Sequence, residues 1–233
     1  MSLFVIGDTH LSFGTEKPMD IFAGWENYTQ LLHDAWLREV SPEDTVVLAG
    51  DISWGMSLTE ALPDFRWLND LPGKEKIILK GNHDYWWTTM KKMQDFLAEN
   101  RLDTLRILHN NCYAYGSYGI CGTRGWVNME PESAKADDAK VSAREAQRLE
   151  VSILAAEQRE LRPLVFLHYP PVYGASCNYS MLEVLWRHPV TDCWYGHVHG
   201  RAQQKYAING ERDGVCYHLI SGDYVHFVPQ KIL

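Results

Sequence analysis

The sequence lacks any stretch of about 18 consecutive apolar residues, the length that a membrane-spanning helix requires. Residues 1–6 contain no basic side chain, and their apolar run is too short for the hydrophobic region of a secretory signal. These absences exclude a membrane-spanning segment. They predict a soluble, cytoplasmic protein that has no membrane partner.

The sequence is also poor in cysteine. Its five cysteines are an odd number, and no two of them form a C-x-x-C pair. A disulfide framework and a cysteine zinc site are therefore not indicated, and we expect reduced thiols that are mostly buried. No C-x5-R loop follows any predicted strand, which argues against an enzyme with a cysteine nucleophile.

Positive charge is in deficit. The sequence has 22 Lys and Arg residues against 30 Asp and Glu residues, a net charge of −8. Because binding to duplex nucleic acid normally requires clustered Lys and Arg, we expect no such partner. A small phosphorylated substrate stays compatible with this charge, since bound metal ions would supply positive charge locally.

Internal repeats, low-complexity linkers and blocks of like charge are absent as well. Of the 233 residues, 45% are hydrophobic, so the chain can bury a core without disulfides. We expect one domain that covers residues 1–233.

Short apolar runs alternate with longer amphipathic segments, a pattern typical of α/β folds. Strands are predicted at 3–7, 45–49, 76–80, 163–167 and 193–195, with two or three more around the glycines of 105–121. Helices are predicted at 26–39, 57–71 (kinked or broken at Pro63), 88–99, 131–160 and 181–187. Alternation around Asn209-Gly210 predicts a hairpin.

Five of the polar clusters in the sequence follow predicted strands. They are Gly7-Asp8-Thr9-His10, Gly50-Asp51-Ile52-Ser53, Gly81-Asn82-His83-Asp84, His168-Tyr169-Pro170-Pro171 and Gly196-His197-Val198-His199-Gly200. The carboxyl ends of strands line the ligand crevice of open α/β sheets, so these clusters should converge in space.

The residue types in the clusters point to a metal site. Asp, Asn and His offer oxygen and imidazole ligands without sulfur, a set that suits Mn²⁺, Fe or Zn²⁺ better than Ca²⁺. In the D-x-H and H-x-H pairs, side chains at i and i+2 point the same way from an extended chain. Each pair can therefore bind one ion or straddle two neighbouring ions.

The ordered set GDTH, GDIS, GNHD, HYPP and GHVHG resembles the five-motif signature of the calcineurin-like metallophosphoesterase superfamily. The motifs extend from Gly7 to Gly200, nearly the whole chain. The resemblance implies a metallophosphatase-like, four-layer α/β/β/α sandwich. It also implies a dinuclear site for two divalent metal ions, Mn²⁺, Fe²⁺/Fe³⁺ or Zn²⁺.

The resemblance further implies a role for each residue. Asp8, His10 and His199 would bind the first ion, Asn82, His168 and His197 the second, and Asp51 would bridge the two. His83, oriented by Asp84, would stand beside the ions as the catalytic general acid.

A metal pair of this kind activates a bridging water, and the resulting hydroxide attacks phosphorus opposite the leaving alkoxide. The expected activity is therefore hydrolysis of phosphomonoesters or phosphodiesters, with small nucleotides or metabolites as the favoured substrates. The sequence does not distinguish monoesters from diesters. The alternative is a catalytically silent scaffold with the same fold that binds other proteins, although such scaffolds typically lose ligands or the catalytic histidine.

Several side chains near the clusters are candidates for substrate binding. The aromatic candidates are Trp54, Trp86 and Trp126, which could stack on a base or sugar or belong to the core. Arg124 could bind a phosphate in a bidentate manner or form a surface salt bridge. No motif surrounds the remaining histidines, which include His188 and His218, and we expect surface or core roles for them.

Overall fold

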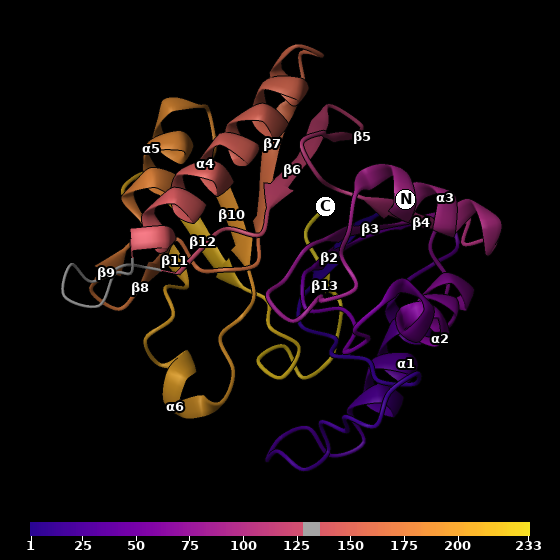
Figure 1. Ribbon diagram of the computed structural model, residues 1–233. Helices are drawn as coiled ribbons and strands as arrows, with labels where there is room; N and C mark the ends of the chain where they lie inside the picture. The colour runs from indigo at the N-terminus through magenta and orange to yellow at the C-terminus, as the bar shows by residue number, and fades with distance from the viewer. Residues whose placement is uncertain (128–135) are drawn as a thin grey trace. The chain divides into compact units, whose positions relative to one another are not determined.

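The structure, a computed structural model, describes residues 1–127 and 136–233. It is a mixed α/β fold with parallel and antiparallel strands, which confirms the predicted class (Figure 1). The chain divides into two compact units, the first formed by Met1–Ile107 with Ile220–Leu233 and the second by Leu108–Leu219. Each unit has its own sheet, helices and core. The single domain and the stacking of two sheets into four layers stay predictions.

The sheet of the first unit has the strand order β13-β1-β2-β3-β4. Its strands are β1 (Leu3–Ile6), β2 (Thr45–Ala49), β3 (Glu75–Leu79), β4 (Leu105–Ile107) and β13 (Gln230–Lys231). Strands β1 to β4 are parallel, and β13 pairs with β1 in the antiparallel direction. The carboxyl ends of β1, β2 and β3 therefore lie at one edge, where the first three polar clusters follow them.

Three helices cover one face of this sheet: α1 (Tyr28–Glu39), α2 (Leu58–Asp70) and α3 (Met90–Glu99). Alternate strand residues such as Ile6 and Leu48 pack against Trp36 and Phe65 of the helices. Helix α2 continues through Pro63, so no break occurs there. The Ser57 side chain begins this helix by accepting a hydrogen bond from the Glu60 N–H.

The sheet of the second unit has the order β11-β12-β10-β7-β6-β5. Its strands are β5 (Tyr113–Tyr115), β6 (Tyr118–Thr123), β7 (Arg162–Leu167), β10 (Asp192–Tyr195), β11 (Gly210–Arg212) and β12 (Val215–Leu219). The four central strands are parallel, and β5 and β11 form antiparallel edges. A separate pair, β8 (Val172–Tyr173) and β9 (Ser176–Cys177), lies outside this sheet.

The predicted hairpin exists, but its turn was misplaced. Gly210 begins β11, and the turn to β12 is Asp213-Gly214, where both residues have positive φ (52° and 81°). Two successive residues with positive φ are the requirement of a type I′ hairpin turn, and Asp-Gly satisfies it as well as Asn-Gly does.

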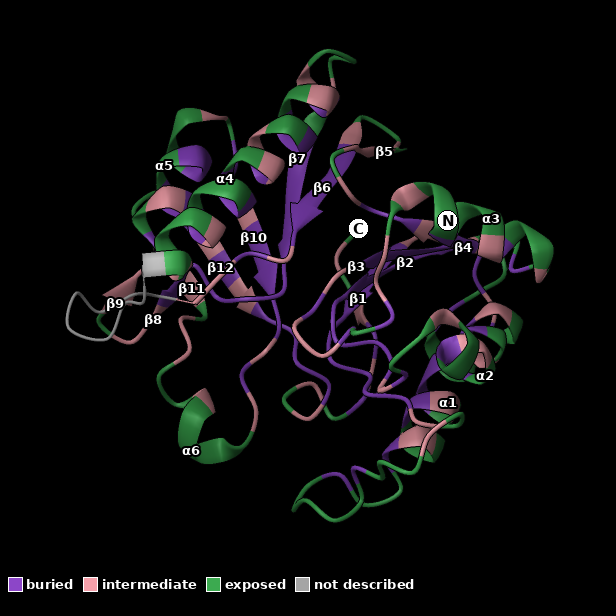
Figure 2. Cartoon of the chain, in the orientation of Figure 1, coloured by how far each residue is buried: buried purple, intermediate pink, exposed green. Residues whose placement is uncertain are grey.

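The helices of the second unit are α4 (Ala136–Glu157), α5 (Tyr179–Arg187) and the short α6 (Arg201–Gln204). Alternate strand residues such as Val165 and Tyr195 pack with Leu149 and Leu185 of α4 and α5. The central strands β6, β7 and β10 are largely buried, whereas the helices expose their outer faces (Figure 2). Residues 131–135, the start of the predicted helix, lie outside the described residues.

Among the described residues, no helix combines the length and the apolar character that crossing a membrane would take. All five cysteines are free thiols, as expected. Only Cys121 and Cys193 are buried, however, and Cys112, Cys177 and Cys216 are partly exposed.

Candidate metal centre

The loops that follow β1 and β2 hold three predicted ligands in an uncommon backbone conformation. Asp8, His10 and Asp51 have φ values of 58°, 42° and 52°, in the left-handed region. Asp8 N–H donates to Gly50 O, and His10 N–H donates to Asp51 O, both at 2.9 Å. Such conformations cost free energy and persist only where the surrounding structure fixes them, which is common at functional sites.

The side chains of these three residues are close together and almost fully buried. A carboxylate oxygen of Asp8 and a ring nitrogen of His10 lie within 4.8 Å of each other. His10 Nε2 lies 3.6 Å from Asp51 Oδ2. Their exposed fractions are 0%, 3% and 1% for Asp8, His10 and Asp51. Buried carboxylates are costly unless a cation or strong donors compensate their charge, so this arrangement suits a metal ion.

The loop after β3 packs against the Asp51 loop. His83 N–H donates to Asp51 Oδ1 at 2.7 Å, which orients that carboxylate. A Cβ on Gly81 would lie only 2.1 Å from Asp51 N and Oδ1. Glycine at position 81 therefore permits the close approach of the two loops. Asn82, the predicted ligand between Gly81 and His83 in this loop, is partly exposed.

The Asp84 carboxylate is fully buried and accepts five hydrogen bonds. The donors are the backbone N–H groups of Gly81 (2.7 Å), Asp51 (2.9 Å), Ile52 (2.8 Å) and Ser53 (3.3 Å) and the indole N–H of Trp86 (3.0 Å). Burial raises the pKa of Asp84 to about 6, the charge of Asp51 adds to the rise, and the backbone donors oppose it. Asp84 thus holds the backbone that carries Asp51. That Asp84 also orients the His83 imidazole stays a prediction.

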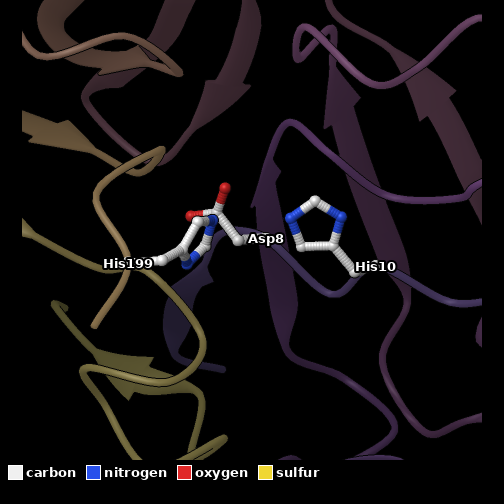
Figure 3. A group of neighbouring side chains, drawn as sticks. All are labelled: Asp8, His10 and His199. Atoms are coloured by element: carbon white, nitrogen blue, oxygen red, sulfur yellow. The ribbon is translucent and has the colours of Figure 1, made fainter. Parts of the chain in front are cut away.

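In the second unit, the predicted ligands follow β7 and β10. His168 is fully buried, and its backbone N–H donates to Arg124 O at 3.1 Å. Ring nitrogens of His168 and His197 lie within 4.8 Å of each other, and their ring centroids are 5.1 Å apart. His197 has a φ of 72°, a fourth ligand position with left-handed backbone. Figure 3 draws the side chains of Asp8 and His10, which follow β1, and of His199, which follows β10.

A cavity of about 330 Å³ in the second unit opens beside two of these histidines. Its wall is mainly aromatic and apolar with a few polar groups: Val127, Tyr169, Pro170, Tyr173, Ser176, His197, Val198, His199 and Gln203. The Tyr169 ring packs 4.2 Å from the His197 ring. An apolar cavity with a few converging polar groups is the usual form of a small-molecule site.

The predicted substrate-binding tryptophans of the first unit have different environments. Trp86 is 2% exposed and packs edge-on against Phe65, which agrees with the core role that the sequence left open for it. Trp54 is partly exposed, stacks on the His10 ring at 5.0 Å and lies 4.4 Å from the His83 ring. Trp54 therefore contacts a predicted ligand and the predicted acid.

Arg124 and Trp126 lie together in the second unit. The Arg124 guanidinium is 4.4 Å above the Trp126 ring, and its Nη2 lies 3.3 Å from Glu145 Oε1. The ion pair is the alternative to phosphate binding that the sequence left open. Arg124 Nε has no hydrogen-bond partner among the described residues, so one buried donor stays available. Trp126 packs 5.7 Å from Tyr169, which lines the cavity.

Sequence reasoning did not single out Tyr169 and Tyr173 as pocket residues. Tyr169 directly follows His168 in the HYPP cluster, and this position beside a ligand was the available signal. Tyr173 had none, because β8 and its partner β9 have only two residues each.

At the five motifs, the side chains that could ligate metal ions are Asp8, His10 and Asp51 in the first unit and His168, His197 and His199 in the second. All are carboxylates or imidazoles, and Asn82 would add an amide oxygen. This set contains no sulfur and fits divalent ions such as Mn²⁺, Fe²⁺ or Zn²⁺.

Comparison with solved structures shows a similar fold. The crystal structure of a protein of unknown function from Aquifex aeolicus is 16% identical, with a TM-score of 0.51 over 99% of this chain and 95% of that chain. No curated protein matches the sequence at a significant level.

A family model described as calcineurin-like phosphoesterase matches residues 1–201. The match includes all seven predicted ligands and His83, and the mixed α/β structure agrees with the metallophosphatase fold. The chain belongs to the calcineurin-like phosphoesterase family.

Proposed function

We propose that the protein hydrolyses phosphomonoesters or phosphodiesters of small nucleotides or metabolites with the help of two divalent metal ions. One observation carries the proposal: carboxylates of the first unit and imidazoles of both units follow parallel strands at the positions of the motifs, and Asp8, His10, Asp51 and His168 among them are buried. Membership of a family of metal-dependent phosphoesterases supports the reaction class.

The ligands of both units would bind the ions together. Asp8, His10 and His199 would hold the first ion and Asn82, His168 and His197 the second, with Asp51 shared between them. When bound, such a pair neutralises phosphate oxygens and lowers the pKa of water. The chain itself contributes preorganisation, because the hydrogen bonds to Asp84 fix the loop of Asp51 before any substrate arrives.

His83 would hold the proton that the leaving oxygen receives. Its backbone is fixed by the hydrogen bond to Asp51, and its ring lies beside those of Trp54 (4.4 Å) and His10 (5.6 Å). Imidazole is the side chain that most often serves as a general acid or base in enzymes. A general acid of this kind contributes roughly 10²- to 10⁴-fold.

A small substrate agrees with the cavity beside His197 and His199. Its volume of about 330 Å³ suits a nucleotide-sized or smaller group, and Tyr169 and Tyr173 offer ring surfaces for stacking. A long nucleic acid strand would instead need a basic groove, which a net charge of −8 does not favour.

A protein-binding scaffold is the second candidate, because the family also includes inactive members. Loss of ligands or of the catalytic histidine would favour it. This sequence has all seven ligand positions and His83, and this completeness favours the enzyme.

The test is hydrolysis of aryl phosphomonoesters and phosphodiesters by metal-free protein supplied with Mn²⁺, Fe²⁺, Zn²⁺ or Ni²⁺. We expect activity with at least one ion, and loss of that activity in Asp51→Asn and His168→Ala. Matched controls are Asp95→Asn and His33→Ala, which alter an exposed residue of α3 and a partly exposed residue of α1. Full activity of Asp51→Asn would show that the metal assignment is wrong. Absence of ion binding by the wild-type protein would instead favour the scaffold.

A further inference from the structure

A second group of metal-ligating side chains lies on the sheet of the second unit. Cys216 and His218 are at i and i+2 of β12, so their side chains point to the same face. Asp192 begins β10 and is the register partner of Cys216 across the parallel pair β10·β12. This C-x-H pair has the spacing of Asp8-Thr9-His10, with a carboxylate supplied by the neighbouring strand.

The three side chains are close enough to share one ion. One ligand atom of each residue, the thiol sulfur, a ring nitrogen and a carboxylate oxygen, lies within 4.8 Å of the other two. His218 Nε2 lies 2.8 Å from Asp192 Oδ1, and each of these side chains is 33% exposed. Ligands of one zinc ion are about 3–4 Å apart, given bond lengths of about 2.0–2.3 Å. A small opening of the His218–Asp192 pair would make room for the ion, and solvent has access to the site.

Neighbouring groups hold two of the ligands in place. The His218 ring stacks on Trp194 with centroids 5.0 Å apart and an angle of 15°. Trp194 stacks in turn on the fully buried Phe166 at 5.1 Å and 19°. Thr191 Oγ1 donates to the second oxygen of Asp192 at 2.8 Å. Support of this kind for imidazole and carboxylate ligands is a regular feature of metal sites.

Negative charge collects around the thiol. Glu211 on β11 is the register partner of Cys216 on the side opposite to Asp192. Burial raises the pKa of the Cys216 thiol, and the charges of Asp192 and Glu211 raise it further. The same two carboxylates attract a cation, and Glu211 is exposed and able to become a fourth ligand.

We propose that Asp192, Cys216 and His218 form a mononuclear binding site for a borderline transition-metal ion, Zn²⁺ in particular, with Glu211 or water in the fourth position. Sulfur, imidazole and carboxylate together select such an ion over Mg²⁺, Ca²⁺ and Mn²⁺. The site does not depend on the proposed hydrolase function. It is built at the beginning of β10, whereas His197 follows the end of that strand. A bound ion would link β10 to β12.

Titration with Co²⁺ under a phosphine reductant tests the site on the full-length protein. Thiolate bonded to Co²⁺ gives an intense near-ultraviolet charge-transfer band, which the sulfur-free ligands of the phosphoesterase site cannot produce. In the wild type, we expect the band to saturate at one Co²⁺ ion per protein molecule. We expect Cys216→Ser to lose the band completely and His218→Ala to weaken it strongly. Cys177→Ser is the matched control, because Cys177 is also partly exposed, and it should keep the band. Zn²⁺ should bleach the band by displacement.

A second measurement requires no substitution and so does not depend on how the variants fold. Zn²⁺ should protect Cys216 of the wild-type protein from alkylation, as followed by peptide mass spectrometry, and leave Cys177 reactive. A wild type without the charge-transfer band overturns the proposal, and so does a band that survives Cys216→Ser. Equal alkylation of Cys216 with and without Zn²⁺ would contradict it independently.

Discussion

Substitution of His83 can distinguish a role in proton transfer from a role in metal binding. The backbone N–H of His83, not its side chain, forms the hydrogen bond to Asp51, so His83→Ala keeps that contact. We expect the variant to retain its metal content and to lose roughly 10²- to 10⁴-fold in kcat, because only the proton donor is gone. Steady-state kinetics and elemental analysis of the same sample check both parts.

Substrates with different leaving groups give a more specific test of the general-acid role of His83. A nitrophenolate leaves without a proton, whereas an alkoxide requires one, so His83→Ala should be far slower on alkyl diesters than on nitrophenyl diesters. His33→Ala, on the exposed side of α1, is the control and should behave like the wild type on both. Equal losses for the two leaving groups, or loss of metal, would rule out the general-acid role of His83.

The placement of a side chain was predictable from the sequence where it depends only on neighbouring residues in the chain. The i and i+2 spacing predicted that Asp8 and His10 share one face of an extended segment. Their ligand atoms do lie within 4.8 Å, but the backbone there is left-handed at both residues and not extended. The sequence did not distinguish the buried Trp86 from the partly exposed Trp54, because the position of a residue beside a loop does not determine whether its side chain is buried. The pairing of Cys216 with Asp192 depends on the register between two strands, which no local pattern specifies.

At the scale of elements, Asp64 ties helix α2 to the loops that carry the ligands. Phe13 N–H donates to Asp64 Oδ1 at 2.7 Å, and the Ser53 hydroxyl donates to the other oxygen. Asp64 is fully buried, and burial raises its pKa from 3.8 to about 6, opposed by the hydrogen bonds from Ser53 and Phe13. One carboxyl group thus connects α2 with the segments after β1 and β2.

This raised pKa makes the stability of the fold depend on pH. The folded state binds a proton at Asp64 that the unfolded state has released between pH 3.8 and about 6. The Asp64 contribution to the free energy of unfolding is therefore complete below this window and is lost as pH rises through about 6, by up to about 3 kcal/mol. Asp64→Asn should remove the contribution, because the amide carries no proton to lose.

Urea unfolding of metal-free wild type and Asp64→Asn across this pH range measures the effect as the difference between the two free energies. Asp34→Asn, an exposed residue of α1, is the control and should follow the wild type. A difference between wild type and Asp64→Asn that is constant with pH would contradict the raised pKa of Asp64.

Elements were predictable in proportion to how completely they are buried. The run 46–49 is apolar throughout because β2 is buried along its whole length, and the predicted bounds of the strand, 45–49, are those observed. Short strands such as β8 and β13 have two residues each, and their pairing partners rather than their composition make them strands. The hairpin turn was misplaced because Asn209-Gly210 and Asp213-Gly214 are equally good turn sequences.

At the scale of the whole molecule, the seven proposed ligands divide between the two units, Asp8, His10, Asp51 and Asn82 in the first and His168, His197 and His199 in the second. Ions bound by ligands of both units stabilise both. Mn²⁺ should therefore slow amide hydrogen exchange in the loops after β1 and β2 and equally in those after β7 and β10. It should leave the beginning of β10 unchanged, because Mn²⁺ has little affinity for the thiol of Cys216.

Exchange measured by mass spectrometry on metal-free and Mn²⁺-loaded protein checks this pattern. Asp51→Asn should lose the protection in both units at once, since Asp51 is the proposed shared ligand. Cys216→Ser is the matched control and should keep it, because that residue is outside the proposed pair of ions. Protection confined to one unit would mean that the ions are bound by that unit alone. The motifs of the other unit would then need a different explanation.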